Sequence, residues 1–277
     1  MNLYERDYTE INNDEEQEAL KEYNEHNKKI DITFITEDLR FSHPNLECRR
    51  FLLQHTSLFP NNFLDSIFPF NSGLDKPDFL LESEKYKELI YNNGKEIEIQ
   101  KYIKTNRKWF IPGSIFRDYN FGNHDAYLFP EQMLGAEYRV DYLLLGKNSD
   151  GFSMVLVEFE TADTPFLLGT TDTESASVRK GLTQIKNWKR WLENNRNYLF
   201  ESMGFKDKSI DIPIFRTYYC LVVSRRDYMD KRALDVRSQL CYEMNNTKII
   251  TFDRLSDNIK HLYHDGLLLL NKQDPTL

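Results

Sequence analysis

With 277 residues, of which 40% are hydrophobic and 14% aromatic, the chain is long enough for one sizeable core or two small domains. Its net charge of −8 argues against a protein that coats nucleic acid non-specifically, although a local basic face stays compatible with that sum. The sequence contains no apolar run of bilayer length, no secretory signal pattern and only three scattered cysteines, so we expect a cytoplasmic protein without a disulfide framework or zinc site.

The first 84 residues differ in pattern from the rest of the chain. Residues 1 to about 30 are rich in charged side chains and predict a mobile or peripheral arm with one short helix. From 30 to 81 the chain is apolar and aromatic but interrupted by prolines, which indicates a small domain or a cover on the main body. We therefore expect residues 1–84 to form an accessory region, α/β or mostly helical, and residues 85–277 to form the main domain.

The main domain reads as alternating helices and strands. Apolar spacing predicts helices at 83–91, 95–106, 175–194 and 231–245. Strands are predicted at 139–146, 152–160, 218–223 and 248–252, and the turn at 147–151 joins the first two into a hairpin. The unbroken apolar run at 218–223 is typical of a strand with helices on both faces of its sheet. The order indicates an α/β fold.

The most informative residues are carboxylates on the two strands of the predicted hairpin. Glu158 and Glu160 alternate along one strand and so share a face, and Asp141 comes from the neighbouring strand. Together with the backbone carbonyl of Phe159, Asp141 and Glu158 predict an oxygen-lined site for Mg²⁺ or Mn²⁺. Glu160 is either a further ligand or a base that orients the attacking water. The simpler interpretation is a solvated strand end that points outward.

The helix that follows carries polar residues that suit such a site. Gln184 is predicted to position a water or phosphate, and Lys180 or Arg179 to screen phosphate charge. The DNA-binding residues predicted from the basic helix face and a charged loop are Arg179, Lys180, Lys186, Lys189, Arg190 and Arg225. A solvated surface and an ordinary charged loop are the alternatives.

Several stretches in this order resemble the nuclease domain of the Shedu antiphage defence proteins, a branch of the PD-(D/E)xK superfamily. The resemblance covers about residues 85–258 and is most specific in the Gln184-x-x-x-Trp188 helix. The matching stretches are 96–103, 138–142, 156–160 followed by 164–166, 184–192, 219–225 and 250–255, the last similar to the closing strand of the family.

The resemblance implies a restriction-endonuclease-like core with a mixed central sheet flanked by helices. It implies that Asp141, Glu158 and Glu160 are the metal-binding and catalytic triad, with Gln184 beside them and Glu96 as an accessory acid. The superfamily usually has a lysine where this chain has Glu160, so a glutamate there must act as ligand or base. The variable N-terminal regions of the family are thought to sense or regulate.

The leading hypothesis is a Mg²⁺-dependent DNA endonuclease in bacterial defence against phage. It includes DNA as substrate, a homo-oligomeric state and a phage or host activator sensed by the N-terminal region, with no membrane partner. One alternative keeps the fold but makes it a catalytically inactive nucleic-acid-binding or scaffolding module. A second treats Glu158 and Glu160 as surface charges of a protein-interaction domain.

Overall fold

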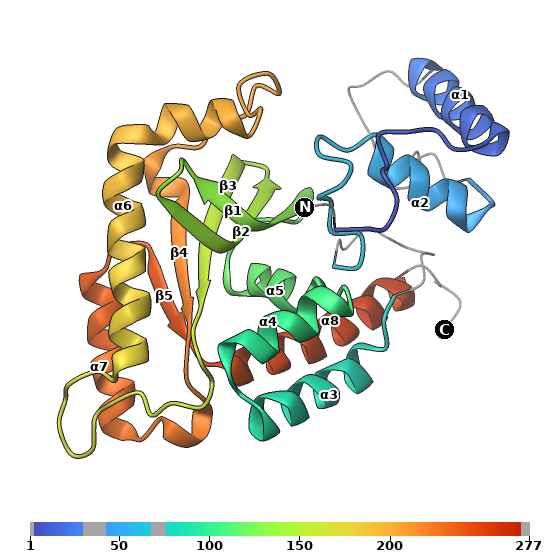
Figure 1. Cartoon of the computed structure of the whole chain (residues 1–277). Helices are drawn as coiled ribbons and strands as arrows, with labels where there is room; N and C mark the ends of the chain where they lie inside the picture. Colours follow the sequence, from blue (N-terminus) through green and yellow to red (C-terminus); the bar gives the residue numbers. More distant parts are fainter. Residues whose placement is uncertain (1–2, 30–42, 68–75, 273–277) are drawn as a thin grey trace.

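The structure is a computed structural model that describes residues 3–29, 43–67 and 76–272. Its centre is one five-stranded sheet in the order β1-β2-β3-β4-β5 (Figure 1). The strands are β1 (Asp125–Leu134), β2 (Tyr138–Asn148), β3 (Gly151–Phe159), β4 (Thr217–Val222) and β5 (Thr247–Ile250). The pairs β1–β2 and β2–β3 are antiparallel, whereas the pairs β3–β4 and β4–β5 are parallel. The predicted α/β fold with a mixed sheet is therefore confirmed.

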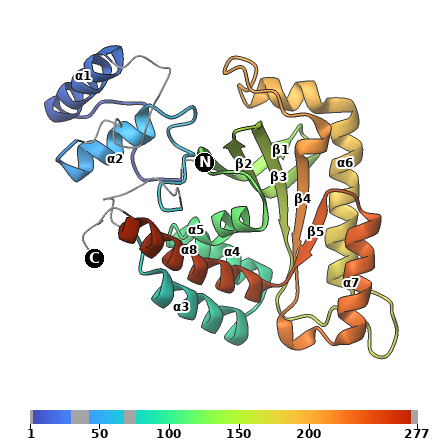
Figure 2. The same ribbon diagram turned by 180° about the vertical axis from the view of Figure 1, so that it is seen from behind.

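Helices cover both faces of this sheet. They are α1 (Asp14–Lys29), α2 (Leu46–His55), α3 (Phe79–Asn92), α4 (Glu96–Thr105), α5 (Phe110–Gly113), α6 (Ala176–Ser202), α7 (Lys231–Glu243) and α8 (Phe252–Lys272), with short 3₁₀ turns η2 (Ser114–Asp118), η3 (Ile214–Arg216) and η4 (Arg226–Tyr228). Figures 1 and 2 show α6 and α7 on one side, α3, α4, α5 and α8 on the other, and α1 with α2 apart from both. None of the helices within the described ranges is long and apolar enough to cross a membrane.

The strand β3 contributes to two cores because its side chains alternate. Met154 and Leu156 pack with α6 and α7, whereas Val155 and Val157 pack with α3, α4, α5 and α8. All four side chains are fully buried. This double coverage explains the unbroken apolar run of the central strands, since neither face meets water. It also means that a carboxylate at the end of β3 lies against a helix rather than in solvent.

The N-terminal segment, predicted to be a mobile or peripheral arm, is anchored to the main body at its start. Leu3 is fully buried, and its carbonyl accepts a hydrogen bond of 2.6 Å from Trp109 Nε1. The helices α1 and α2 share a small core of their own, formed by Tyr8, Ala19, Cys48, Phe51 and Leu52. A few buried side chains thus anchor a segment whose overall composition is polar.

Residues near the predicted domain boundary belong to the main body. The helix α3 spans position 84, and Ser83 Oγ donates to the backbone carbonyl of Ser256 in α8 at 3.0 Å. Upstream, Leu64 N donates to Ala126 O at 2.8 Å, which adds a short stretch of backbone to the outer edge of β1. The division after residue 84 stays a prediction, and α3 runs through that position.

Two elements differ from the sequence prediction. The strand β1 was not predicted, because Pro130 and the left-handed Glu131 (φ 51°) break its pattern. An edge strand tolerates both, since it pairs on one side. The predicted last strand ends at Ile250, and Phe252 begins α8 instead of continuing the closing strand. The helix prevails there because Phe252, Leu255 and Ile259 recur at helical spacing and are buried.

Candidate active site

The carboxylates of Glu158, the penultimate residue of β3, and of Glu160, just after β3, are buried beneath α6. Glu158 and Glu160 keep 3% and 2% of their surface exposed, so the interpretation as a solvated strand end is wrong. Gly181 of α6 permits this close cover, because a Cβ there would lie 2.3 Å from Leu221 Cδ1 and 3.2 Å from Glu160 Cγ. A glycine within an amphipathic helix was the sequence signal for this approach, and sequence reasoning missed it.

The neighbouring strand delivers the third carboxylate. The β2–β3 register pairs Tyr142 with Val157. Because the two strands are antiparallel, Asp141, which precedes Tyr142, lies beside the end of β3. Asp141 Oδ2 accepts a hydrogen bond of 2.7 Å from the backbone N–H of Phe159. The ring of Phe159 lies on the other face, against Tyr142 and Phe252. The hairpin therefore brings an acid of β2 beside the acids at the end of β3, as the sequence predicts.

Two side chains of α6 reach this acidic group from successive turns. Gln184 Nε2 donates to Glu158 Oε1, and Lys180 Nζ donates to Glu160 Oε2 at 3.0 Å. Lys180 Nζ also lies 3.4 Å from Oε2 of Glu96, in the first turn of α4. The structure thus brings together all the acids named from the sequence, with Gln184 and Lys180. We call Glu96, Asp141, Glu158 and Glu160 the acidic cluster.

Burial and the charges of neighbouring acids favour protonation of Asp141, Glu158 and Glu160. Burial raises the pKa of Glu158 well above its ordinary value, and the charges of Asp141 and Glu160 raise it further. Burial also raises the pKa of Asp141, against the opposing hydrogen bond from Phe159. The pKa of Glu160 is raised by burial, although Lys180 partly offsets this effect. A cation within the cluster would remove the same repulsion that a bound proton removes.

The donor set is chemically suited to a hard divalent cation, although its side chains are engaged with protein partners. Carboxylate oxygens are the ligands that Mg²⁺ and Mn²⁺ prefer. Glu160 Oε1 is buried and has no hydrogen-bond partner in the described part of the chain. Within the same residues, no three His, Cys, Asp or Glu side chains already stand together as a metal site. Lys180 and Gln184 occupy oxygens that a metal would need, so binding requires them to rearrange.

The family can now be identified from the sequence itself. Residues 93–256, more than half of the chain, match the model of the C-terminal region of Shedu protein SduA. The chain belongs to the Shedu family. The matched region contains every member of the acidic cluster together with Gln184, whereas α1, α2 and α3 precede it.

Other comparisons add little to this assignment. No curated protein matches the chain. Among solved structures, restriction endonuclease FokI alone and FokI bound to DNA are similar at 12% identity, covering 69% and 73% of this chain with TM-scores of 0.35 and 0.34. The Shedu family chain covers 32% and 33% of those chains, about a third of their length.

The basic residues predicted to bind DNA fall into two groups. Arg179, Lys180, Lys186 and Arg190 are exposed along α6 of this Shedu chain. Lys189 instead lies 4.8 Å over the ring of Tyr219, and its Nζ donates to Asn245 O at 2.6 Å. Arg179, Lys186 and Arg190 are therefore available to a partner, whereas contacts within the chain account for Lys180 and Lys189.

Arg225 has a structural role as well. Its guanidinium donates to the carbonyls of Ile90 and Tyr91 and lies 3.3 Å from Asp163 Oδ1. Asp163 Oδ2 in turn accepts from the backbone N–H of Gly94 at 2.9 Å. Sequence reasoning missed this link, which fixes the α3–α4 turn, and thus Glu96, beside the loop that leaves β3.

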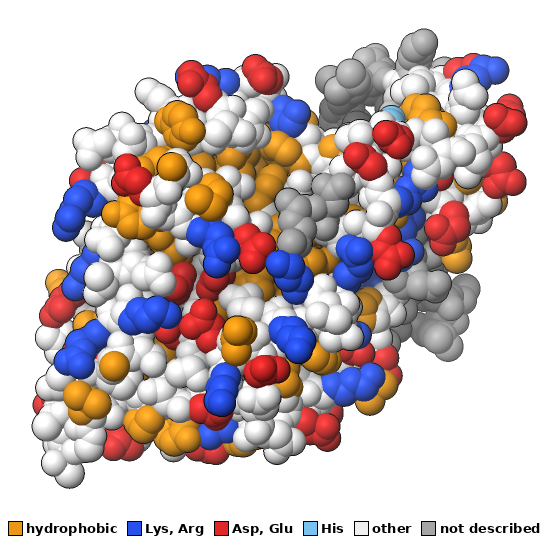
Figure 3. All heavy atoms as spheres, in the orientation of Figure 1, with side chains coloured by type: hydrophobic (Ala, Val, Ile, Leu, Met, Phe, Trp, Pro, Cys, Tyr) orange, Lys and Arg blue, Asp and Glu red, His pale blue; other side chains and the backbone are white. Residues whose placement is uncertain are grey.

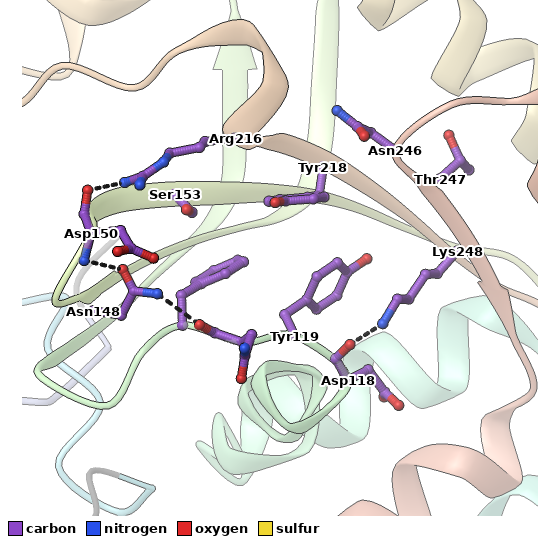
Figure 4. A pocket seen from close by; sticks show the side chains of 12 residues that line it. Asp118, Tyr119, Asn148, Asp150, Ser153, Arg216, Tyr218, Asn246, Thr247 and Lys248 are labelled. Atoms are coloured by element: carbon purple, nitrogen blue, oxygen red, sulfur yellow. Dashed lines mark hydrogen bonds between the residues drawn. The ribbon is translucent and has the colours of Figure 1, made fainter.

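A pocket close to the sheet lies at its other end. It has a volume of about 490 Å³ and sits where β3, β4 and β5 begin (Figure 4). Its lining includes Tyr119, Phe121, Tyr218, Arg216 and Lys248. Figure 3 shows acidic side chains gathered near the middle of one face, where Figure 1 places the opposite end of β3 between α6 and α4. The acidic cluster and this pocket are therefore separate features.

Proposed function

We propose that this chain is a Mg²⁺-dependent DNA endonuclease of bacterial defence against phage, able to use Mn²⁺ as well. The observation that carries the proposal is the grouping of Asp141 with the buried Glu158 and Glu160 at the end of β3, where the charges of Asp141 and Glu160 raise the pKa of Glu158. Structural stability alone does not favour such a group, and perturbed carboxyls of this kind concentrate at functional sites. Membership of the Shedu family supports the same function.

Each residue then has a role in phosphodiester hydrolysis. A bound divalent cation would supply charge neutralisation at the phosphate and acidify a water ligand. Asp141 and Glu158 would hold that cation, with the Phe159 carbonyl as a further ligand. Glu160 accepts a proton from water or completes the ligand set, and Gln184 orients the water or phosphate from α6. The exposed cations Arg179, Lys186 and Arg190 of the same helix face the DNA backbone in this proposal.

The wider proposal concerns the rest of the chain. Residues 1–84 precede the region matched by the family model, and we assign them a regulatory role in sensing a phage or host activator. A homo-oligomeric state and a cytoplasmic location belong to the same proposal. A defence nuclease must be restrained in its host, and a separate N-terminal core around α1 and α2 offers a place for that control.

One observation favours a second function. Glu160 stands where the superfamily usually has a lysine, and its carboxylate is already engaged by Lys180. A non-catalytic nucleic-acid-binding or scaffolding module would need no metal. Its DNA binding would persist in chelator and weaken with salt.

The deciding experiment is cleavage of supercoiled and linear DNA with Mg²⁺ or Mn²⁺, using wild type and Glu158→Gln. We expect cutting by wild type, none in chelator and none by the variant. Glu82→Gln is the matched control, because Glu82 of α3 is also a buried glutamate but lies outside the acidic cluster. Its carboxylate forms an ion pair of 2.8 Å with Lys108. Cutting by Glu158→Gln at the wild-type rate would refute the assignment of the active site to the acidic cluster. Metal-independent DNA binding without any cutting would favour the second function.

A further inference from the structure

Lys180 occupies an unusual position for a surface lysine. Its side chain is 56% exposed, yet its ammonium group contacts Glu160, whose side chain is 3% exposed, at 3.0 Å. The same ammonium lies 3.4 Å from Glu96 on a different helix. Burial lowers the pKa of Lys180, but the hydrogen bonds and charges of Glu160 and Glu96 outweigh this effect and raise it. The lysine therefore stays charged at the mouth of the acidic cluster.

Lys180 bonds to carboxylate oxygens that a bound metal ion would use as ligands. Lys180 holds Oε2 of Glu160, while Oε1 of that residue is buried without a hydrogen-bond partner among the described residues. The charge of Lys180 also lowers the pKa of Glu158, which its other neighbours raise. A lysine ammonium and a divalent cation stabilise the same carboxylates, and two cations this close repel each other.

We propose that Lys180 is the resident counter-cation of the acidic cluster and that a divalent cation binds by displacing it. This inference rests on the proposed function, because it concerns the same site. Since binding equilibria are reciprocal, whatever draws Lys180 away strengthens metal binding, and metal binding releases Lys180. The exposed stem of the side chain lets the released ammonium turn outward along α6, towards a phosphate group such as that of the proposed substrate.

The first test measures Mn²⁺ affinity by calorimetry, without DNA, in alkaline buffer where protons compete less. Lys180→Met keeps the length of the stem but removes the charge, and we expect it to bind Mn²⁺ roughly threefold to tenfold more tightly than wild type. Lys180→Arg keeps the charge and should bind about as wild type does. Lys186→Met is the matched control, because Lys186 is exposed on the same helix. Unchanged or weaker binding by Lys180→Met would overturn the inference.

The second test follows the displacement in the wild-type protein. Acylation of lysines is quantified by mass spectrometry with and without Mn²⁺, and Lys186 serves as the internal reference. We expect Mn²⁺ to increase the labelling of Lys180 while that of Lys186 stays constant, because the ammonium loses its carboxylate partners. Equal labelling of Lys180 in both conditions would contradict displacement.

The outcomes separate this inference from the proposed function. If wild type binds Mn²⁺ and Glu158→Gln does not, the metal site holds, and only the behaviour of Lys180→Met decides the inference. If neither wild type nor Lys180→Met binds Mn²⁺, both fail together. If Lys180→Met gains binding that wild type lacks, the displacement model holds in its strongest form.

Discussion

The two ends of the parallel strands hold polar groups in opposite ways. The 490 Å³ pocket lies where β3, β4 and β5 begin, and two of its cationic side chains bond to backbone carbonyls. Lys248 donates to the carbonyl of Asp118, and Arg216 donates to that of Asp150 (Figure 4). Where β3 ends, the carboxyl groups of Glu158 and Glu160 are buried, and Lys180 bonds to Glu160 and to Glu96.

The volume of a cavity alone does not mark the candidate active site of this sheet. Cations that bond to backbone carbonyls around a cavity are compatible with stability, whereas buried like charges cost free energy that a bound cation or proton recovers. Such uncompensated groups are typical of functional sites, which trade stability for activity. The acidic end is therefore the better candidate, although the larger cavity lies elsewhere.

The largest effect should come from neutralising one acid at each end. Asp141→Asn should reduce the cleavage rate by at least about a hundredfold, because a metal ligand is worth several kcal/mol of transition-state stabilisation. Asp150→Asn, in the lining of the pocket, should leave the rate within about twofold. Single-turnover cleavage at saturating metal measures both. A loss of rate in the pocket variant instead would reverse the assignment of the two ends.

The close approach of α6 gives the next largest effect. Gly181→Ala places a Cβ 2.3 Å from Leu221 Cδ1 and should lower the free energy of unfolding by about 1–3 kcal/mol. The shift of α6 should also weaken cleavage, because Gln184 and Lys180 move with the helix. Thr183→Ala, two residues on and exposed, is the control and should change stability little. Denaturant titration gives the values, and a fully stable Gly181→Ala would mean that the packing is looser than described.

The raised pKa of Glu158 predicts that the stability of the fold depends on pH through the acidic cluster. A carboxyl whose pKa is higher in the folded than in the unfolded state stabilises the fold while both states are protonated. That stabilisation is lost as the pH rises from the ordinary glutamate value through the raised one. In chelator, the melting temperature should therefore fall on going from mildly acidic to alkaline pH. Glu158→Gln should flatten this slope, and an unchanged slope would contradict the assigned cause.

The smallest effect concerns DNA affinity along the exposed side of α6. Neutralising Lys186 and Arg190 to glutamine should weaken DNA binding roughly threefold to tenfold and reduce its salt dependence by about one unit of slope per lost phosphate contact. Lys248→Gln at the pocket end should leave binding unchanged, since that lysine bonds within the chain. Fluorescence anisotropy at several salt concentrations tests both. Equal losses at the two ends would place DNA across the whole sheet.

Particular residues show how far the sequence carries. The alternation of Glu158 and Glu160, and the hairpin that brings Asp141 beside them, follow from strand geometry and a loop-rich turn. The spacing of α6 likewise predicts that Lys180 and Gln184 share a face. In contrast, the left-handed Glu131 interrupts the alternation of β1, so the residue pattern does not predict that strand. The helix α8 begins two residues after β5 ends, which is too close for the pattern to separate the two elements.

Local periodicity along the chain is enough to predict most helices and strands and the meeting of Asp141 with Glu158 and Glu160. The mixed sheet and the place of Glu96 follow from motif order, through the resemblance to the Shedu family. Tertiary packing decides that Glu158 and Glu160 are buried rather than solvated, since Gly181 lets α6 cover them. It also decided that Lys180 bridges Glu160 and Glu96, and that Arg225 supports the α3–α4 turn. Such contacts join residues far apart in sequence, and their burial and charge balance arise only when separate elements pack.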